Sequence, residues 1–184
     1  MEKQALRKKL LQERLAISEK EHAQLSKTIG DKLFALGFVQ NARRVMAYCT
    51  HQNEPDLMAF MHACLDARKC VSLPYVVGEG QMIPVDFDKE CKLQENAYGI
   101  PEPVLKNDCD PLSPDVVIVP GIAYDNRLHR VGFGGGYYDR YLASTGAIKI
   151  GVCFDSQIVS SAFADSHDVA MDLVITEKRS MGVK

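Results

Sequence analysis

The sequence predicts an α/β protein whose mostly parallel sheet is covered by helices on both faces, a three-layer α/β/α arrangement of the Rossmann-like type. Runs rich in β-branched residues alternate with segments of helical periodicity, which is the pattern of such folds. One run, DVVIVP at residues 115–120, is apolar almost throughout, as expected of a strand that is buried on both faces. The sequence contains neither an internal repeat nor a linker-like segment, so we expect residues 1–184 to form a single domain.

Two helices are expected at the start of the chain. Leucines recur at roughly helical spacing over residues 6–15, which predicts the first helix. Ser18 is followed three residues later by Glu21, a capping-box pattern that marks the start of a second helix. This second helix should run toward Leu36 and end at Gly37.

The next part of the chain predicts a strand, a helix and two further strands. Residues 44–49 (RVMAYC) form a short β-rich run, and residues 55–68 place apolar side chains at helical spacing. Residues 70–77 and 82–87 have the composition of strands and are separated by a Gly-Glu-Gly turn. Residues 88–114 have weak periodicity and several prolines, so we expect this segment to be rich in loops.

The remaining elements follow the strand at residues 115–120. Residues 136–144 predict a helix, and residues 148–154 (IKIGVCF) predict a strand. A short helix is expected near residues 156–163, and a last strand at residues 173–176 (LVIT). Strands and helices thus continue to alternate, in keeping with the predicted fold class.

Composition and charge argue against several classes of protein. Apolar residues make up 46% and charged residues 25% of the chain, which does not suit a disordered or membrane-embedded protein. The formal net charge of −2 provides no overall field that would attract nucleic acid. No apolar run approaches the roughly 20 residues that span a bilayer, and the first residues lack the apolar stretch of a secretion signal. We therefore expect a cytoplasmic protein with neither a membrane nor a nucleic acid as partner.

The six cysteines show no C-x-x-C pair and no spacing typical of a zinc site. We expect them to be reduced and mostly packed, although the sequence leaves a disulfide open. The histidines show no metal spacing either.

The most informative segment is residues 120–140, in which four glycines fall within residues 132–136. Glycine permits backbone conformations that other residues avoid, and the exposed N–H groups at a helix start suit a phosphate. The segment lacks the Gly-Lys-Ser/Thr of a Walker A loop and fits a dinucleotide-binding fingerprint poorly. A plain flexible turn is the alternative. Asp139 could hold Mg²⁺ over phosphates, or it could simply complement the helix dipole, and the tyrosines before it could be core residues.

Residues 120–140 resemble the signature of the 5-formyltetrahydrofolate cyclo-ligases, also called methenyltetrahydrofolate synthetases. The matching residues are Pro120, Gly121, Ala123, Tyr124, Asp125, Arg130, Val131, Gly132, Gly134, Gly136, Tyr137, Tyr138, Asp139 and Arg140. Other features similar to this family are Lys3 and Arg7, an acidic motif at residues 53–56, the GIPEP segment at residues 99–103, and Asp168 with Asp172. The resemblance therefore extends over nearly the whole chain in the right order.

Two departures from the family pattern concern the acidic motif and the glycine segment. Pro55 and Leu57 stand where the family more often has Val and Thr. Phe133 and Gly135 stand where some members carry a basic residue.

The resemblance implies an ATP-dependent, monomeric ligase that acts on a reduced folate. It would cyclise 5-formyltetrahydrofolate to 5,10-methenyltetrahydrofolate, with release of ADP and phosphate, through phosphorylation of the formyl oxygen and attack by N10. Such a reaction needs positioning and charge stabilisation more than a protein nucleophile.

The resemblance also implies a role for particular residues. ATP would be bound by Lys3, Gln4, Ala5, Leu6, Arg7, Arg130, Val131, Gly132, Phe133, Gly134, Gly135, Gly136, Tyr137 and Tyr138. The folate would be bound by Cys49, Glu54, Phe133 and Tyr137. Asp139 and Asp168 would hold Mg²⁺, and Arg130, Tyr137 and Arg140 would be catalytic.

Structural interpretations remain open for several of these residues. Lys3 and Arg7 lie four residues apart on one helical face, which could be merely an exposed basic face. We expect Lys8, Lys9 and Arg14 to be solvated, and Cys49 to be a wall of the pocket without a nucleophilic role. Glu102 lies between two prolines and is either a substrate contact or part of a rigid turn.

Two other classes of function remain as alternatives. Sugar-phosphate isomerases and CoA-transferases can share a related α/β architecture, and fold alone does not establish activity. A nucleotide- or folate-binding module without catalytic activity is the second alternative. ATP turnover that depends on a reduced folate would separate both from a cyclo-ligase.

Overall fold

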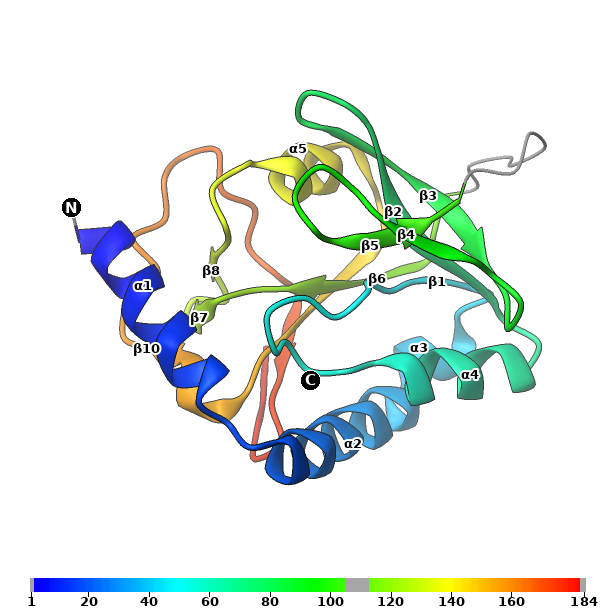
Figure 1. The fold of residues 1–184 in the computed structure, drawn as a ribbon, viewed down its shortest axis with the longest axis horizontal. Coiled ribbons are helices and arrows are strands. Elements are labelled where there is room, and N and C mark those ends of the chain that lie inside the picture. Colours follow the sequence, from blue (N-terminus) through cyan, green and yellow to red (C-terminus); the bar gives the residue numbers. More distant parts are fainter. Residues whose placement is uncertain (1, 105–112, 183–184) are drawn as a thin grey trace.

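The computed structural model of the protein describes residues 2–104 and 113–182. A seven-stranded sheet forms its centre (Figure 1). In spatial order the strands are β12 (Ser180–Gly182), β11 (Leu173–Ile175), β9 (Ile148–Val152), β6 (Val116–Pro120), β1 (Arg44–Met46), β2 (Cys70–Gly78) and β3 (Gln81–Phe87). The five inner strands pair in parallel, and only the two edge strands run antiparallel to their neighbours. The predicted mostly parallel sheet is confirmed.

One face of the sheet is covered by α2 (Glu19–Ala35), α3 (Gly37–Asn41) and α4 (Met58–Asp66), which lie together below the sheet in Figure 1. The apolar side chains of these helices are fully buried against the strands, as Leu33 and Met61 illustrate. Because parallel strands expose apolar side chains on both faces, this layer buries only half of the sheet.

The opposite face is covered by α5 (Tyr137–Ser144), α1 (Glu2–Leu15) and a small three-stranded sheet. The small sheet consists of β10 (Ile158–Val159), β7 (Ala123–Asp125) and β8 (Arg130–Val131). Leu142 of α5 is buried against Val117 and Val119 of the central sheet, whereas Leu10 of α1 packs on the small sheet. The predicted α/β class with helices on both faces is therefore confirmed.

Several elements agree with the sequence pattern in detail. The Ser18 hydroxyl caps α2 by accepting a hydrogen bond from the backbone N–H of Glu21 at 3.4 Å. The turn between β2 and β3 lies at the Gly-Glu-Gly sequence, with Gly80 at a φ of 73°. The strand expected at residues 44–49 is shorter in the structure: β1 ends at Met46, the Ala47 N–H still donates to the carbonyl of Ser72 at 2.9 Å, and the chain then continues as a loop.

One prediction of local structure was wrong. Residues 156–163 do not form a helix: a short 3₁₀ turn, η1 (Asp155–Gln157), leads directly into β10. The Gln157 side chain explains the difference, because its amide donates to the carbonyl of Ile122 at 2.6 Å and ties this segment to the small sheet. Within the segment expected to be rich in loops, two short strands, β4 (Leu93–Glu95) and β5 (Pro101–Pro103), form an antiparallel hairpin.

The described part of the chain contains five cysteines, of which Cys49, Cys64, Cys70 and Cys153 are free thiols. The sixth, Cys109, lies outside the described residues. Among the helices that the structure describes, none is both long and apolar enough to cross a bilayer.

Candidate active site

A cavity of about 990 Å³ opens where β1 and β6 end. Ligands of open α/β sheets bind outside the carboxyl ends of the strands, so the position is the expected one. Its walls come from α1, the loop after β1, the β2–β3 and β4–β5 hairpins, the glycine segment before α5, and residues 165–168. The cavity thus combines segments from nearly every part of the described chain.

The glycine segment, residues 132–136, forms one wall of the cavity and leads into α5. Gly134 has a φ of 105°, and Gly136, the N-cap of α5, has a φ of 68°. Residues other than glycine rarely adopt these backbone conformations. The glycines therefore allow the backbone to follow a non-helical conformation up to the point where α5 begins. Those N–H groups and the helix dipole make the end of the segment suitable for an anion.

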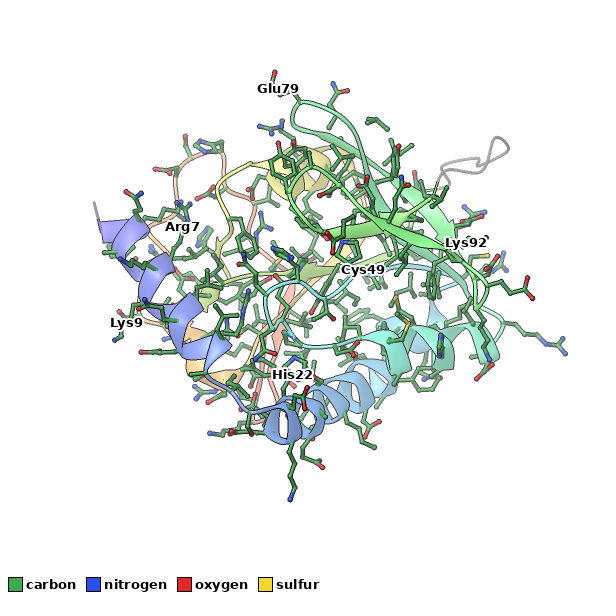
Figure 2. The ribbon with its side chains drawn as sticks, viewed as in Figure 1. Arg7, Lys9, His22, Cys49, Glu79 and Lys92 are labelled. Carbon is green, nitrogen blue, oxygen red and sulfur yellow. The ribbon has the colours of Figure 1, made fainter. Side chains whose placement is uncertain are left out.

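Two cations from α1 reach this wall. The Arg7 guanidinium donates from Nε to the carbonyl of Gly132 at 2.8 Å, which fixes its head beside the segment. The Lys3 ammonium lies 2.9 Å from Asp168 and 3.4 Å from Asp165. Figure 2 shows Arg7 on the side of α1 that faces the body of the molecule and Lys9 on the opposite side. Lys3 and Arg7 therefore form part of the cavity and not simply an exposed basic face.

Asp165, His167 and Asp168 place their ligand atoms within 4.8 Å of one another. Burial opposes ionisation of Asp168, but hydrogen bonds from the Asp165 N–H and the Lys3 ammonium outweigh it and hold its pKa below the usual range. Carboxylate oxygens are the ligands that Mg²⁺ prefers, so Asp168 fits that ion.

Asp139, the other expected magnesium ligand, is paired within the protein. Its Oδ2 accepts from Nη2 of Arg130 at 2.9 Å, and its Oδ1 accepts a long bond of 3.4 Å from the Val169 N–H. The Arg130 guanidinium also lies over the ring of Tyr138, 5.2 Å from its centroid. Asp139 and Arg130 therefore hold α5, β8 and the segment after residue 165 together at the floor of the cavity.

Glu54 is the buried carboxyl group of the site, with its side chain 3% exposed. Burial raises its pKa to about 7, whereas Arg14, the backbone N–H of His51 and Arg130 act in the opposite direction. Its Oε2 accepts from that N–H at 3.2 Å, and its Oε1 has no hydrogen-bond partner among the described residues. A ligand that donates an N–H or O–H could therefore satisfy Oε1.

Arg14 corrects an expectation, because its side chain is fully buried and not solvated. It lies in the last turn of α1, and its guanidinium donates to the carbonyls of Gln52 and Gly121 at 2.9 and 3.2 Å. Helical spacing separates Arg14 from the exposed Lys8 and Lys9, because Arg14 lies two helical turns after Arg7 and therefore on the same face of α1. The loop that packs on this end of the helix then buries it.

Cys49 lies in the wall of the cavity, near the centre of the molecule in Figure 2. Burial raises the pKa of its thiol to about 12, so the thiol stays protonated near neutral pH. This agrees with a wall residue and not with a nucleophile. Beside it, the hydroxyl of the buried Tyr48 donates to the carbonyl of Pro55 at 2.8 Å.

The two hairpins roof the cavity, and their contribution was missed in the sequence except for the GIPEP segment. The hydroxyls of Tyr98, in the β4–β5 turn, and Tyr137 lie 3.1 Å apart. Glu102 holds the hairpin in place, because its carboxylate accepts from the Val76 N–H and the Asn96 amide, each at 3.3 Å. Glu102 lines the cavity, but its Oε2 already accepts both of these hydrogen bonds within the protein.

Arg140 joins the roof to the glycine segment. Its Nε donates to the carbonyl of Gly80 at 2.7 Å, and its Nη2 donates to the carbonyl of Gly135. The guanidinium also lies over the Tyr137 ring, 5.8 Å from its centroid. These contacts favour a role in holding the cavity wall over a direct catalytic one.

Four of the residues expected to contact ATP do not line this cavity. Gln4 and Ala5 are exposed on α1, while Leu6 and Val131 pack in the apolar cluster between α1 and the small sheet. Phe133 does line the cavity, and the residue as a whole is 48% exposed. The other expected residues line the cavity together.

Comparison with known proteins adds to this geometry. The model of the 5-formyltetrahydrofolate cyclo-ligase family matches residues 1–177. The chain is 30% identical to the 5-formyltetrahydrofolate cyclo-ligase of Mycoplasma pneumoniae, over 97% of this chain and 100% of that protein. It is 27% identical to the enzyme of the same name from Escherichia coli K12, over 91% of this chain and 96% of that one.

Solved structures give the same result. An NMR structure of Aquifex aeolicus 5,10-methenyltetrahydrofolate synthetase superposes with a TM-score of 0.86 at 33% identity, covering 99% of this chain and 93% of that one. The 5,10-methenyltetrahydrofolate synthetase of Mycoplasma pneumoniae superposes with a TM-score of 0.78 at 27% identity, covering 96% of this chain and 99% of that one.

Proposed function

The chain belongs to the 5-formyltetrahydrofolate cyclo-ligase family, and from this premise we propose that it converts 5-formyltetrahydrofolate and ATP into 5,10-methenyltetrahydrofolate, ADP and phosphate. One observation carries the proposal: a single cavity joins a cation-flanked glycine segment to a compartment that contains a buried, partly unpaired carboxyl group. The first part suits a polyphosphate, and the second suits a heterocycle that donates hydrogen bonds.

The chemical problem is an unreactive formyl group. Amide resonance deactivates the formyl carbon, and its oxygen cannot leave as oxide. Transfer of the γ-phosphoryl group of ATP to that oxygen creates an electrophilic carbon with a phosphate leaving group. N10 of the folate then attacks this carbon and loses its proton, the ring closes, and inorganic phosphate departs with the formyl oxygen. The balance needs no nucleophile from the protein.

Positioning and charge then become the work of the protein. In this proposal, Lys3, Arg7 and the glycine segment hold the phosphates, and Glu54 and the wall around Cys49 hold the folate. Asp168, with Asp139, would hold Mg²⁺, which supplies positive charge to the phosphate oxygens when it is bound. Arg130 would stabilise the transferring phosphoryl group, and Arg140 would position Tyr137 and the glycine segment. A monomer in the cytoplasm is part of the same proposal.

Oxygen-18 labelling tests the chemistry directly. With 5-formyltetrahydrofolate labelled in its formyl oxygen, we expect the label to appear in inorganic phosphate. With unlabelled folate in labelled water, we expect no label in phosphate. ADP formation without reduced folate serves as the control, and it should be negligible. Label that remains in the folate or passes to water while ATP is consumed would contradict the proposed mechanism.

A further inference from the structure

Arg14 lies at one end of a buried charge pair that the proposed roles of α1 do not use. Its Nη1 is 3.8 Å from Oε1 of Glu54, and both side chains are almost completely excluded from solvent. At this distance the two groups attract each other but form no hydrogen bond. Nη2 of Arg14 and Oε1 of Glu54 both lack a hydrogen-bond partner among the described residues. A buried polar group without a partner is costly, so this arrangement needs a reason.

The same arginine shapes the loop that carries Glu54. Its Nε donates to the carbonyl of Gln52, and the Asn53 side chain donates in return to the carbonyl of Arg14 at 2.8 Å. Gln52 and Asn53 have φ angles of 47° and 62°, which non-glycine residues adopt only when their surroundings hold them there. Arg14 and its backbone therefore clamp the strained turn directly before Glu54.

We propose that Arg14 is the positioning residue for Glu54: it clamps the turn at residues 52–53 and holds the carboxylate close but not hydrogen-bonded, so that Oε1 stays free to accept an N–H donor of the reduced folate. This inference rests on the proposed function, since it concerns the folate compartment of the cavity. A direct bond between Arg14 and Oε1 would occupy the acceptor. A missing charge would leave the carboxylate without electrostatic support.

The electrostatic surroundings of Glu54 make Arg14 its main support. The groups that face Glu54 are Arg14, Arg130, Tyr48, Tyr124 and Tyr138, and His22 contacts only its backbone carbonyl. Of the two cations, Arg14 has the larger effect, and Arg130 is already paired with Asp139. Loss of Arg14 should therefore raise the pKa of Glu54 further and leave its carboxyl protonated at neutral pH.

Arg14→Met is the first test, with Lys9→Met as the matched control on the exposed side of the same helix. Binding of 5-formyltetrahydrofolate and of ATP is measured separately by calorimetry. We expect Arg14→Met to weaken folate binding by about 10-fold or more, the effect of losing support for one charged hydrogen bond, and to leave ATP binding within about 2-fold. Lys9→Met should change neither. An equal loss for both ligands would overturn the proposal, because it would indicate a merely structural role.

The ionisation of Glu54 gives a second measurement that needs no ligand. Carbon-13 NMR of the Glu54 carboxyl, assigned with Glu54→Gln, follows its titration in the free protein. We expect a higher midpoint in Arg14→Met and a midpoint close to that of the wild type in Arg14→Lys, which keeps the charge. An unchanged midpoint in Arg14→Met would overturn the proposal.

Arg14→Lys also covers the case in which Arg14→Met fails to fold. Lysine keeps the charge but cannot donate to both loop carbonyls, so this variant should bind folate more weakly than the wild type and ATP equally well. If Arg14→Lys binds folate as tightly as the wild type, the proposal that Arg14 clamps the turn at residues 52–53 is wrong. If the wild-type protein itself binds no reduced folate, the proposed function fails, while the NMR titration still decides whether Arg14 supports Glu54.

Discussion

At the scale of single residues, the Glu54 carboxyl lies in the proposed folate site, and its burial lowers the stability of the folded protein when it is ionised. The carboxyl group lies in a fully enclosed place, and its pKa of about 7 lies well above the ordinary value of 4.5. The folded protein therefore binds this proton more tightly than the unfolded chain. Stability from this group is complete at acid pH and is lost as the pH rises toward and through 7.

Glu54→Gln should therefore become more favourable to stability as the pH rises. A difference of this size in pKa corresponds to about 3 kcal/mol between about pH 4 and pH 8. We expect the unfolding free energy of the variant, relative to that of the wild type, to increase over this pH range. The variant should also bind folate more weakly than the wild type. Urea unfolding of both proteins at the two pH values measures the effect. A constant difference between them would show that folding does not raise the pKa of Glu54.

Asp139 is a second residue with two roles that can be separated. Since its carboxylate holds the partly buried Arg130, Asp139→Asn should lower the unfolding free energy by about 1–3 kcal/mol. If Asp139 also holds Mg²⁺, the variant should need a higher magnesium concentration for half-maximal turnover. Thermal unfolding and a magnesium titration of the rate measure the two effects. A change in stability with an unaltered magnesium requirement would remove Asp139 from the metal site.

Residue by residue, the sequence predicts the site best where a motif is dense. The glycine segment, Glu54 and the Lys3–Arg7 pair were all identified by resemblance, and the structure gathers them around one cavity. Their individual functions stay predictions. Arg14 was missed although it lies two helical turns after Arg7 on the same face of α1. Its contact with a loop almost 40 residues away could not be read from that spacing.

At the scale of elements, α1 carries two cations that line the cavity and a third, Arg14, that holds the loop forming part of its wall. Lys3 and Arg7 contact residues 165–168 and the glycine segment, whereas Arg14 contacts the loop after β1. Both ends of this one helix therefore matter to the site. Such a helix can be dissected by single substitutions along its length.

Arg7→Ala should affect ATP far more than folate. A charge-assisted hydrogen bond contributes about 1.5–3 kcal/mol, so the KM for ATP should rise by roughly 10- to 150-fold while the KM for folate stays nearly constant. Steady-state kinetics with each substrate varied in turn measures both constants. Lys8→Ala, on an exposed position of the same helix, is the control. Equal increases for both substrates would mean that Arg7 only supports the helix.

Strong local patterns predicted the long elements well, and weak ones left the short elements unpredicted. The helix α2 follows from a capping pattern and apolar periodicity, and β6 follows from its continuous apolar run. The strands β4 and β5 are exposed or proline-bounded segments of three residues each, and they exist because they pair with each other. Tertiary pairing of this kind overrides local propensity.

At the scale of the whole molecule, the fold class was predictable because the alternation of strands and helices extends along the entire chain. The position of the cavity followed from the same alternation, since parallel strands bring their carboxyl ends to one edge of the sheet. The small sheet was not predictable, because β7, β8 and β10 comprise only two or three residues each. Single-domain organisation over residues 1–184 stays a prediction.

The docking of α1 also has a consequence for the order of folding. The contacts of Lys3 and Arg7 join residues 125 to 165 positions apart in the chain, while much of the sheet pairs segments that are closer together. Contacts between distant residues carry a large entropic cost of loop closure, so they form late. The half of the cavity that we propose to bind phosphates should therefore be the last part of the molecule to assemble.

During refolding from urea, this order should appear as a delay between the recovery of secondary structure and the recovery of ATP binding. Far-UV circular dichroism should recover first, and the ability to bind ATP should follow in a slower step. A newly synthesised chain would meet the same constraint, because α1 leaves the ribosome long before residues 132 and 165–168, with which it makes these contacts. The enzyme would thus acquire its proposed nucleotide site only after its framework has formed.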